Sequence, residues 1–203
     1  CTDYMVFLSG LMITLSKYAR QEDIVVGTAI SGRTHKDTEQ MLGMFVNTLA
    51  MRGRPEKDKS CRVFLEEIKE LCLNSYENQE YPFEELLDAV TVHRDPGHNP
   101  LFDVMMTVQN NESAVLKIGQ TTVVGAVNRT QTTSKFDLTL AIVRDETSYK
   151  IITEYCSELF LPETVQRFND HFVHVVNELA ENLDRPIGTV SLATPVFLIC
   201  SIA

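Results

Sequence analysis

Gly43-Met44-Phe45-Val46-Asn47-Thr48-Leu49-Ala50-Met51-Arg52 is the stretch of sequence that decides the fold of this chain. Its side chains alternate between two faces, which predicts a β-strand over 44–52 with one buried face. Asn47 places an amide in the middle of this otherwise apolar strand. A buried amide without hydrogen-bond partners costs about 1–3 kcal/mol. Asn47 is therefore either a structural residue bonded to nearby backbone or a polar group that faces a channel.

The rest of the chain mixes helices and strands around this segment, without strict βαβ alternation. Apolar periodicity and end signals predict helices over 3–18, 60–76, 83–90 and 162–183, and a helical turn over 38–42. Strands are predicted over 24–30, 101–109, 136–143 and 149–155, with short β-like runs at 114–118 and 121–127. This order predicts an α+β two-layer sandwich, in which helices cover one face of a mixed or mostly antiparallel sheet.

Size and charge restrict the classes of function. The 203 residues suffice for one good-sized core. With 18 Lys and Arg against 28 Asp and Glu, the net charge is −10, which argues against nucleic acid and anionic membranes as partners. The five cysteines include no C-x-x-C pair. We interpret them as reduced, mostly buried thiols of a cytoplasmic protein.

The two ends suggest a piece of a longer polypeptide. The chain opens in a helical pattern without a starting Met or an evident cap, and its last ten residues are unusually apolar. We expect one domain over 1–190, followed at 191–203 by a linker or an extra strand towards a next domain.

No catalytic centre or metal site is predicted from the residues themselves. None of the five histidines stands in an H-x-x-x-D arrangement. His171 and His174 share a helix face, but no third ligand is evident, so a helix-surface role is favoured over a metal site. The chain also contains no nucleophile elbow, phosphate-binding loop or dinucleotide fingerprint.

Three further segments have the composition of caps, turns and strand starts. N-Q-E-Y-P-F-E at 78–84 begins a helix near Pro82 and Phe83. The loop R-D-P-G-H-N-P-L at 94–101 is rich in turn residues, and K-F-D-L at 135–138 opens a strand. Taken alone, each is structural; the residues singled out in them are Pro82, Phe83, Arg94, Asp95, Asn99, Pro100 and Asp137.

Together these segments resemble the motifs of peptide-synthetase condensation domains. Residues 43–52, including Gly43, Phe45 and Arg52, resemble G-x-F-V-N-T-x-x-x-R. Residues 78–84 and 94–101 are similar to (H/N)-Q-D-Y-P-F-E and R-D-x-S-R-N-P-L, in the same order and at similar spacing. The likeness covers about residues 2–190. It departs at Glu80, which stands for the usual Asp, and at 97–98, where Gly and His replace Ser and Arg.

The resemblance implies a fold and a reaction. Condensation domains consist of two lobes like chloramphenicol acetyltransferase, with a tunnel between them, and their H-H-x-x-x-D-G motif lies in the N-terminal lobe. This chain then corresponds to the C-terminal lobe, inactive alone, with the histidine motif expected upstream. The reaction forms an amide between an acyl or peptidyl thioester and an aminoacyl acceptor in non-ribosomal, antibiotic-type biosynthesis. Both substrates ride on phosphopantetheine arms of carrier proteins, next to an adenylation domain, and no cofactor is bound directly.

The resemblance also implies roles for individual residues. Asn47 and Ser31 match positions that face the tunnel near the acceptor amine. Arg33, Arg52 and Arg94 are expected to be structural and to pair with carboxylates such as Asp137 or Glu84. The polar stretch 110–134 is a candidate for the segment that crosses to the other lobe.

Two alternatives remain open. The chain could be a non-catalytic scaffold lobe that only binds carrier proteins, or a lobe of a coenzyme A-dependent acyltransferase. The residues encoded upstream discriminate between them, because an intact histidine motif is expected for a catalytic domain.

Overall fold

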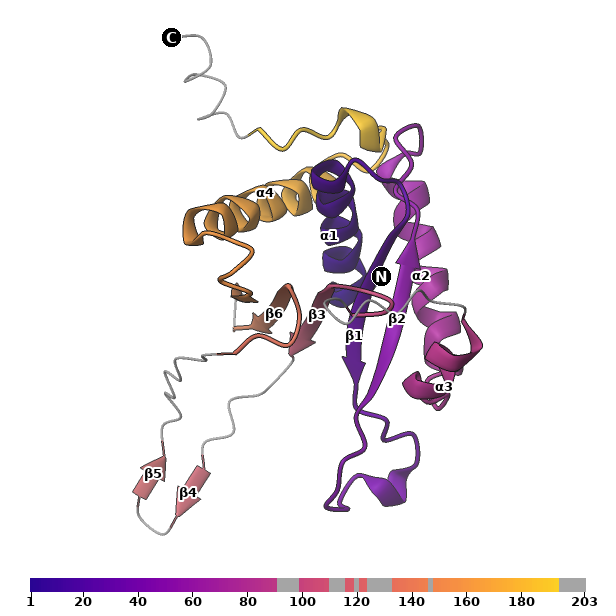
Figure 1. Cartoon of the computed structure of the whole chain (residues 1–203), viewed down its shortest axis with the longest axis vertical. Helices are drawn as coiled ribbons and strands as arrows, with labels where there is room; N and C mark the ends of the chain where they lie inside the picture. The colour runs from indigo at the N-terminus through magenta and orange to yellow at the C-terminus, as the bar shows by residue number, and fades with distance from the viewer. Residues whose placement is uncertain (91–98, 110–115, 119–120, 124–132, 146–147, 194–203) are drawn as a thin grey trace.

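The computed structural model describes residues 1–90, 99–109, 116–118, 121–123, 133–145 and 148–193 (Figure 1). Its helices are α1 (Asp3–Ala19), α2 (Cys61–Glu77), α3 (Phe83–Ala89) and α4 (Pro162–Glu181), with 3₁₀ turns η1 (Lys36–Thr38) and η2 (Ile187–Thr189). Its strands are β1 (Ile24–Ile30), β2 (Asn47–Gly53), β3 (Val104–Gln109), β4 (Leu116–Ile118), β5 (Thr121–Val123), β6 (Leu138–Arg144) and β7 (Tyr149–Tyr155).

Five strands form one mixed sheet in the order β2-β1-β3-β6-β7. β1 and β2 pair antiparallel, as do β6 and β7, and β3 joins the two pairs by running parallel to β1 and β6. β4 and β5 pair only with each other. The mixed sheet expected from the sequence is confirmed.

Helices cover one face of this sheet. The core-facing side chains of the five strands include Val26, Met51, Met106 and Leu140, which are all fully buried. Figure 1 shows α1 between α2 and α4, and α1 contacts both of them as well as β1 and β3. The predicted two-layer sandwich is therefore confirmed.

The central helix α1 is buried on most sides, so its polar groups need internal partners. The hydroxyls of Ser9 and Thr14 donate to the carbonyls of Met5 and Gly10, both at 2.8 Å. Thr2 caps its first turn by accepting from the Met5 backbone N–H at 3.4 Å, so the expected lack of a cap is wrong. None of the described helices is long and apolar enough to cross a bilayer.

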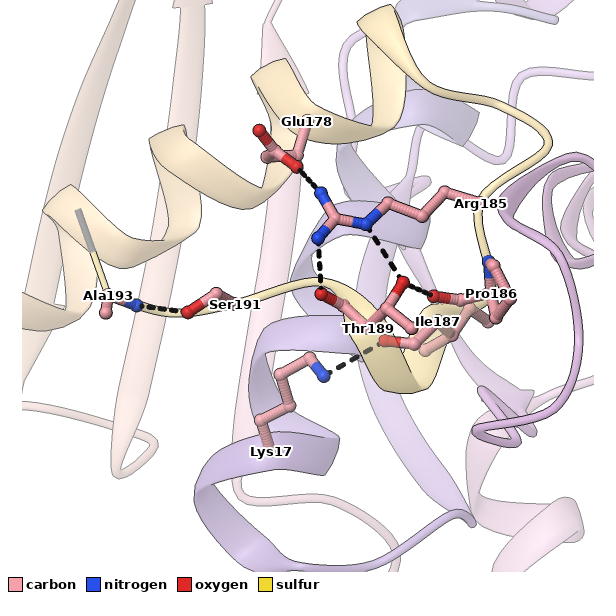
Figure 2. Close-up of polar contacts among 8 residues, drawn as sticks. All are labelled: Lys17, Glu178, Arg185, Pro186, Ile187, Thr189, Ser191 and Ala193. Atoms are coloured by element: carbon pink, nitrogen blue, oxygen red, sulfur yellow. Dashed lines mark hydrogen bonds and ion pairs between the residues drawn. The ribbon is translucent and has the colours of Figure 1, made fainter. Parts of the chain in front are cut away.

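The segment after α4 packs back onto the start of α2, where the Cys61 N–H donates to the Arg185 carbonyl at 2.9 Å. It also contacts the end of α1 through Lys17 (Figure 2). Arg185 donates to the hydroxyl and carbonyl of Thr189 at 2.9 and 2.7 Å and pairs with Glu178, while Lys17 donates to the Ile187 carbonyl at 3.0 Å. Ile187 and Val190 are buried. The packed body thus extends to Leu192, which packs against the core, and residues 194–203 lie outside the described part of the chain.

Three elements differ clearly from the expectation, and one of them is the strand predicted over 101–109, which begins only at Val104. The predicted strand over 44–52 begins only at Asn47, because its partner β1 ends at Ile30, opposite Asn47. The predicted turn over 38–42 is instead the 3₁₀ turn η1 at Lys36–Thr38. The long helices and the hairpin of β6 and β7 lie where the sequence predicts them.

Candidate functional site

The candidate site lies at the end of the sheet where β1 stops and β2 starts. Ser31 follows β1 directly and is exposed. Gly32 has φ +59°, and a Cβ there would collide with the carbonyl of Phe45, so only glycine fits. Arg33 lies over the Phe45 ring, 4.3 Å from its centroid, and donates to the Thr38 carbonyl. These contacts hold the loop between β1 and β2.

Both polar atoms of the Asn47 side-chain amide are hydrogen-bonded to the backbone of this chain. Its Nδ2 donates to the carbonyls of Gln79 and Tyr81, both at 2.8 Å, and its Oδ1 accepts from the Thr48 backbone N–H at 2.8 Å. Thr34 adds a hydrogen bond to Glu80 at 2.7 Å. Asn47 therefore ties the first strand motif to the turn between α2 and α3.

A row of aromatic rings connects the remaining motif segments. The rings of Phe83 and Phe102 lie 5.7 Å apart, and those of Phe102 and Phe136 lie 5.5 Å apart. Phe102 packs against Gly27 of β1, where any side chain would collide with its ring. The structure thus brings Phe83 together with residues that adjoin the 94–101 and 135–138 segments.

The other singled-out residues have local roles or lie outside the description. Pro82 is the N-cap of α3 rather than its first residue, and the Asn99 side chain accepts from the Leu101 N–H at 3.3 Å. Pro100 is half-buried next to it. The Asp137 carbonyl accepts from the Cys156 N–H at 3.0 Å. Arg94 and Asp95 lie in the undescribed segment 91–98.

Arg52 pairs with a carboxylate that the sequence analysis did not name. Its guanidinium donates to both oxygens of Asp23, at 2.8 and 2.6 Å, and not to Asp137 or Glu84. These hydrogen bonds from Arg52 lower the pKa of Asp23. The pairing follows from register, since Val25 stands opposite Arg52 and Asp23 lies just before β1.

A cavity of about 460 Å³ opens at this same end of the sheet. The starts of α1, the ends of β1 and β3 and the last turn of α2 line it, through Asp3, Tyr4, Thr28, Ile30, Tyr76 and Val108. Burial raises the pKa of Tyr4, and it raises the pKa of Tyr76 to about 12. Both phenols therefore stay neutral at physiological pH.

The Tyr4 hydroxyl is buried and has no hydrogen-bond partner within 3.5 Å among the described residues. It lies close to Thr28, whose own hydroxyl donates to the Met106 carbonyl at 2.9 Å. Beside them the Cys72 thiol faces Tyr76, and burial raises the pKa of Cys72 to about 11. A thiol with a raised pKa is a poor nucleophile, so Cys72 is a packing residue.

A second cavity, of about 400 Å³, lies on the other side of the first turn of α1. Its walls are mostly apolar and include Phe7, Tyr149 and Val176. Asp3 borders both cavities, and its carboxylate accepts from the Tyr149 hydroxyl at 2.6 Å and pairs with Arg144 at 3.4 Å.

Neither histidines nor other ligands gather into a metal site within the described residues. His171 instead bonds through Nδ1 to the Tyr18 hydroxyl at 2.8 Å, and burial lowers its pKa. The helix-surface interpretation of His171 is consistent with this geometry.

Comparison with known proteins decides the family. The model of the family described as "Condensation domain" matches residues 1–197. The chain is 40% identical over 195 residues to tyrocidine synthase 3 of Brevibacillus parabrevis, which covers 96% of this chain and 3% of that protein. It is 42% identical over 181 residues to gramicidin S synthase 2 of Aneurinibacillus migulanus, covering 89% and 4%. This chain belongs to the condensation domain family.

Solved structures share the fold of this condensation-domain chain. A four-domain nonribosomal peptide synthetase bound to AMP and glycine superimposes with a TM-score of 0.88 at 23% identity, over 96% of this chain and 16% of that one. A variant of the starter condensation domain of rhizomide synthetase gives a TM-score of 0.75 at 18% identity, over 94% and 45%. The chain thus spans less than half of that condensation domain and a few per cent of the curated synthetases.

The sequence analysis of this condensation-domain chain missed the cavity beside α1. Tyr4 and Tyr76 are ordinary members of amphipathic helices, and 72 residues separate them in the sequence. The one available signal was Thr28, a hydroxyl inside the buried run of β1.

Proposed function

We propose that this chain is the C-terminal lobe of a condensation domain that forms an amide bond in non-ribosomal peptide synthesis. The observation that carries the proposal is the family match over residues 1–197, together with close similarity to peptide synthetases along nearly the whole chain. The donor is an acyl or peptidyl thioester on one carrier protein, and the acceptor is an aminoacyl group on another. Phosphopantetheine arms carry both substrates, and the lobe binds no cofactor of its own.

The reaction needs three physical contributions. The acceptor amine must be held against the carbonyl carbon of the thioester, the developing oxyanion must be stabilised, and the proton of the amine must be removed as the C–S bond breaks and the phosphopantetheine thiol leaves. The proton acceptor is expected from the histidine motif of the N-terminal lobe. This lobe contributes the acceptor wall, where we place Ser31 as a hydrogen-bonding partner of the amine.

Asn47 contributes in a different way from Ser31. Both hydrogens of its amide bond to backbone carbonyls, so a direct bond to substrate requires one of these bonds to break. We therefore propose Asn47 as a positioning residue of the tunnel wall, which acts by holding the turn at 79–81.

The proposed partners follow from the same assignment. They are the N-terminal lobe, two carrier proteins and an adjacent adenylation domain. Leu42 and Met44 are 101% and 89% exposed beside the site, and we expect the N-terminal lobe to cover them. The unpaired buried thiols Cys61 and Cys72 fit a cytoplasmic, reducing compartment.

The test is amide formation between two loaded carriers by the intact synthetase that contains this chain. Ser31→Ala is expected to lower the single-turnover rate about tenfold or more, because it removes the hydroxyl that we propose to bond the acceptor amine. Asn47→Ala is expected to lower the rate by a similar factor. Ser157→Ala and Asn182→Ala, both exposed and on segments that do not line the site, are the matched controls.

The outcomes of this experiment separate the proposed function from the scaffold and acyltransferase alternatives. If the parent synthetase forms no amide with any acceptor but binds both carriers, the lobe is a scaffold. Transfer from coenzyme A to an alcohol identifies the acyltransferase alternative. If amide forms and Asn47→Ala leaves its rate unchanged, the positioning role of Asn47 is wrong.

A further inference from the structure

The cavity between α1 and α2 adjoins the residues proposed to hold the acceptor amine. Ile30, one of its walls, precedes Ser31 and pairs with Asn47 across the hairpin of β1 and β2. Tyr76, another wall, leads into the turn whose carbonyls Asn47 binds. A group attached next to an amine at Ser31 can therefore reach this cavity.

The size of the cavity suits one substrate side chain. At about 460 Å³ it falls within the range of small-molecule pockets, roughly 300–1,000 Å³. Its walls combine apolar surface from Ile30 and Val108 with the polar groups of Thr28 and Tyr76. Such a wall binds side chains that carry both carbon and a polar group.

The charge of the walls selects against anions. Among the described residues that line the cavity, Asp3 is the charged one, and its carboxylate is already paired with Arg144 and bonded by the Tyr149 hydroxyl. The phenol of Tyr76 remains a neutral hydrogen-bonding group at physiological pH, whereas the Tyr4 hydroxyl is buried within the wall. A carboxylate side chain entering here would lose its water and find no unpaired cation in the described lining.

We propose that this cavity binds the side chain of the acceptor aminoacyl group, accepting uncharged side chains and rejecting carboxylates. The inference rests on the proposed function, because it takes Ser31 as the contact of the acceptor amine. Tyr76 is then a specificity-determining residue, and Asp3, by neutralising Arg144, leaves the cavity without a net positive charge that would attract acidic acceptors.

The experiment offers two acceptors to the intact synthetase in one tube. One acceptor carrier bears glutaminyl and the other glutamyl, which differ in charge and hardly in shape. The parent protein is expected to form the glutaminyl product at least about tenfold faster. Asp3→Asn is expected to narrow this ratio several-fold, because it leaves the positive charge of Arg144 uncompensated beside the cavity.

A second pair of variants tests the shape of the pocket. Tyr76→Ala enlarges the cavity and is expected to shift the product ratio towards bulkier acceptors, such as tryptophanyl over alanyl, by about tenfold. Tyr18→Ala is the matched control, since Tyr18 lies in the last turn of α1 at the opposite end and packs against Phe168. A product ratio from one tube does not depend on the fraction of folded enzyme.

Two results overturn the inference without touching the proposed function. One is equal rates for glutaminyl and glutamyl acceptors in the parent protein. The other is a Tyr76→Ala variant whose product ratio equals that of the parent. Failure to form any amide would instead count against the proposed function itself.

Discussion

At the scale of single residues, buried hydroxyls show how this chain distributes its polar groups. Ser9, Thr14 and Thr28 each donate to a backbone carbonyl at 2.8–2.9 Å. Tyr4 differs, because its buried hydroxyl has no partner within 3.5 Å among the described residues and interacts only weakly with the Thr28 hydroxyl. A buried polar group left unpaired costs about 1–3 kcal/mol.

Tyr4→Phe is therefore expected to raise the free energy of unfolding of the domain by about 1 kcal/mol. The substitution keeps the ring packing and removes only the unpaired hydroxyl. Urea denaturation measures the change, with Tyr76→Phe as the control that loses a hydroxyl facing Cys72 and gains no stability. A clear loss of stability in Tyr4→Phe would mean that this hydroxyl has a partner.

Single residues also show where sequence reasoning reaches its limit. Asn47 could be singled out because it interrupts an apolar pattern, and Gly43 and Arg52 because they match the motif of condensation domains. Their partners could not, since Asn47 binds carbonyls 32 and 34 residues away and Arg52 binds Asp23. A side-chain pattern predicts that a polar group needs a partner, but only the fold brings one within reach.

At the scale of elements, the segment after α4 (residues 182–190), which we call the clasp, connects the helices through hydrogen bonds. The amides of Cys61 and Ile187 donate to the carbonyls of Arg185 and Lys59, at 2.9 and 2.8 Å, so two distant segments share backbone hydrogen bonds. Arg185 reinforces this arrangement through Glu178 and Thr189 (Figure 2).

Arg185→Ala is expected to destabilise the clasp by about 1–2 kcal/mol, because charge-assisted bonds within one network are lost. Hydrogen exchange of the amides of Ile187 and Val190 should accelerate about tenfold, while the sheet stays protected. Arg62→Ala is the matched control, since the Arg62–Asp184 pair is exposed and such pairs contribute little. If Arg62→Ala destabilised the domain and accelerated the exchange as much as Arg185→Ala, the stabilising role of Arg185 in the clasp would be contradicted.

Element boundaries depend on partners that a local pattern does not contain. Residues 44–46 alternate like a strand, yet they lie beyond the end of β1 and have no strand to pair with there. The helices, in contrast, satisfy their hydrogen bonds within themselves, so their limits agree with the periodicity to within about two residues. This difference explains why the strands were the less accurate part of the prediction.

At the scale of the whole molecule, motif segments that lie far apart in the sequence meet at two places in the fold. Residues 43–52 join 78–84 through Asn47, and the rings of Phe83, Phe102 and Phe136 join the later segments. The layered α+β class was predictable from the order of elements. The strand order was not, because β3 lies between β1 and β6 through long-range parallel pairing.

The packing of α1 against α2 also couples folding to alkaline pH. Burial raises the pKa of Cys72 from 9.0 to about 11 and that of Tyr76 from 10.0 to about 12, and it raises the pKa of Tyr4 as well. Between about pH 9 and 12 the unfolded chain therefore binds fewer protons than the folded one. Stability must fall as the pH rises through this window.

The double variant Cys72→Ala with Tyr76→Phe isolates this effect, because neither new side chain titrates. The urea midpoint of the parent domain should fall steadily from pH 8.5 to 11, and the variant should show a clearly shallower fall, whatever its absolute stability. Cys1→Ser is the control, since Cys1 is an exposed thiol and its removal should leave the slope unchanged. An equal slope in parent and double variant would mean that these two groups ionise as readily in the folded domain as in the unfolded chain, and that the contact between α1 and α2 is open to water.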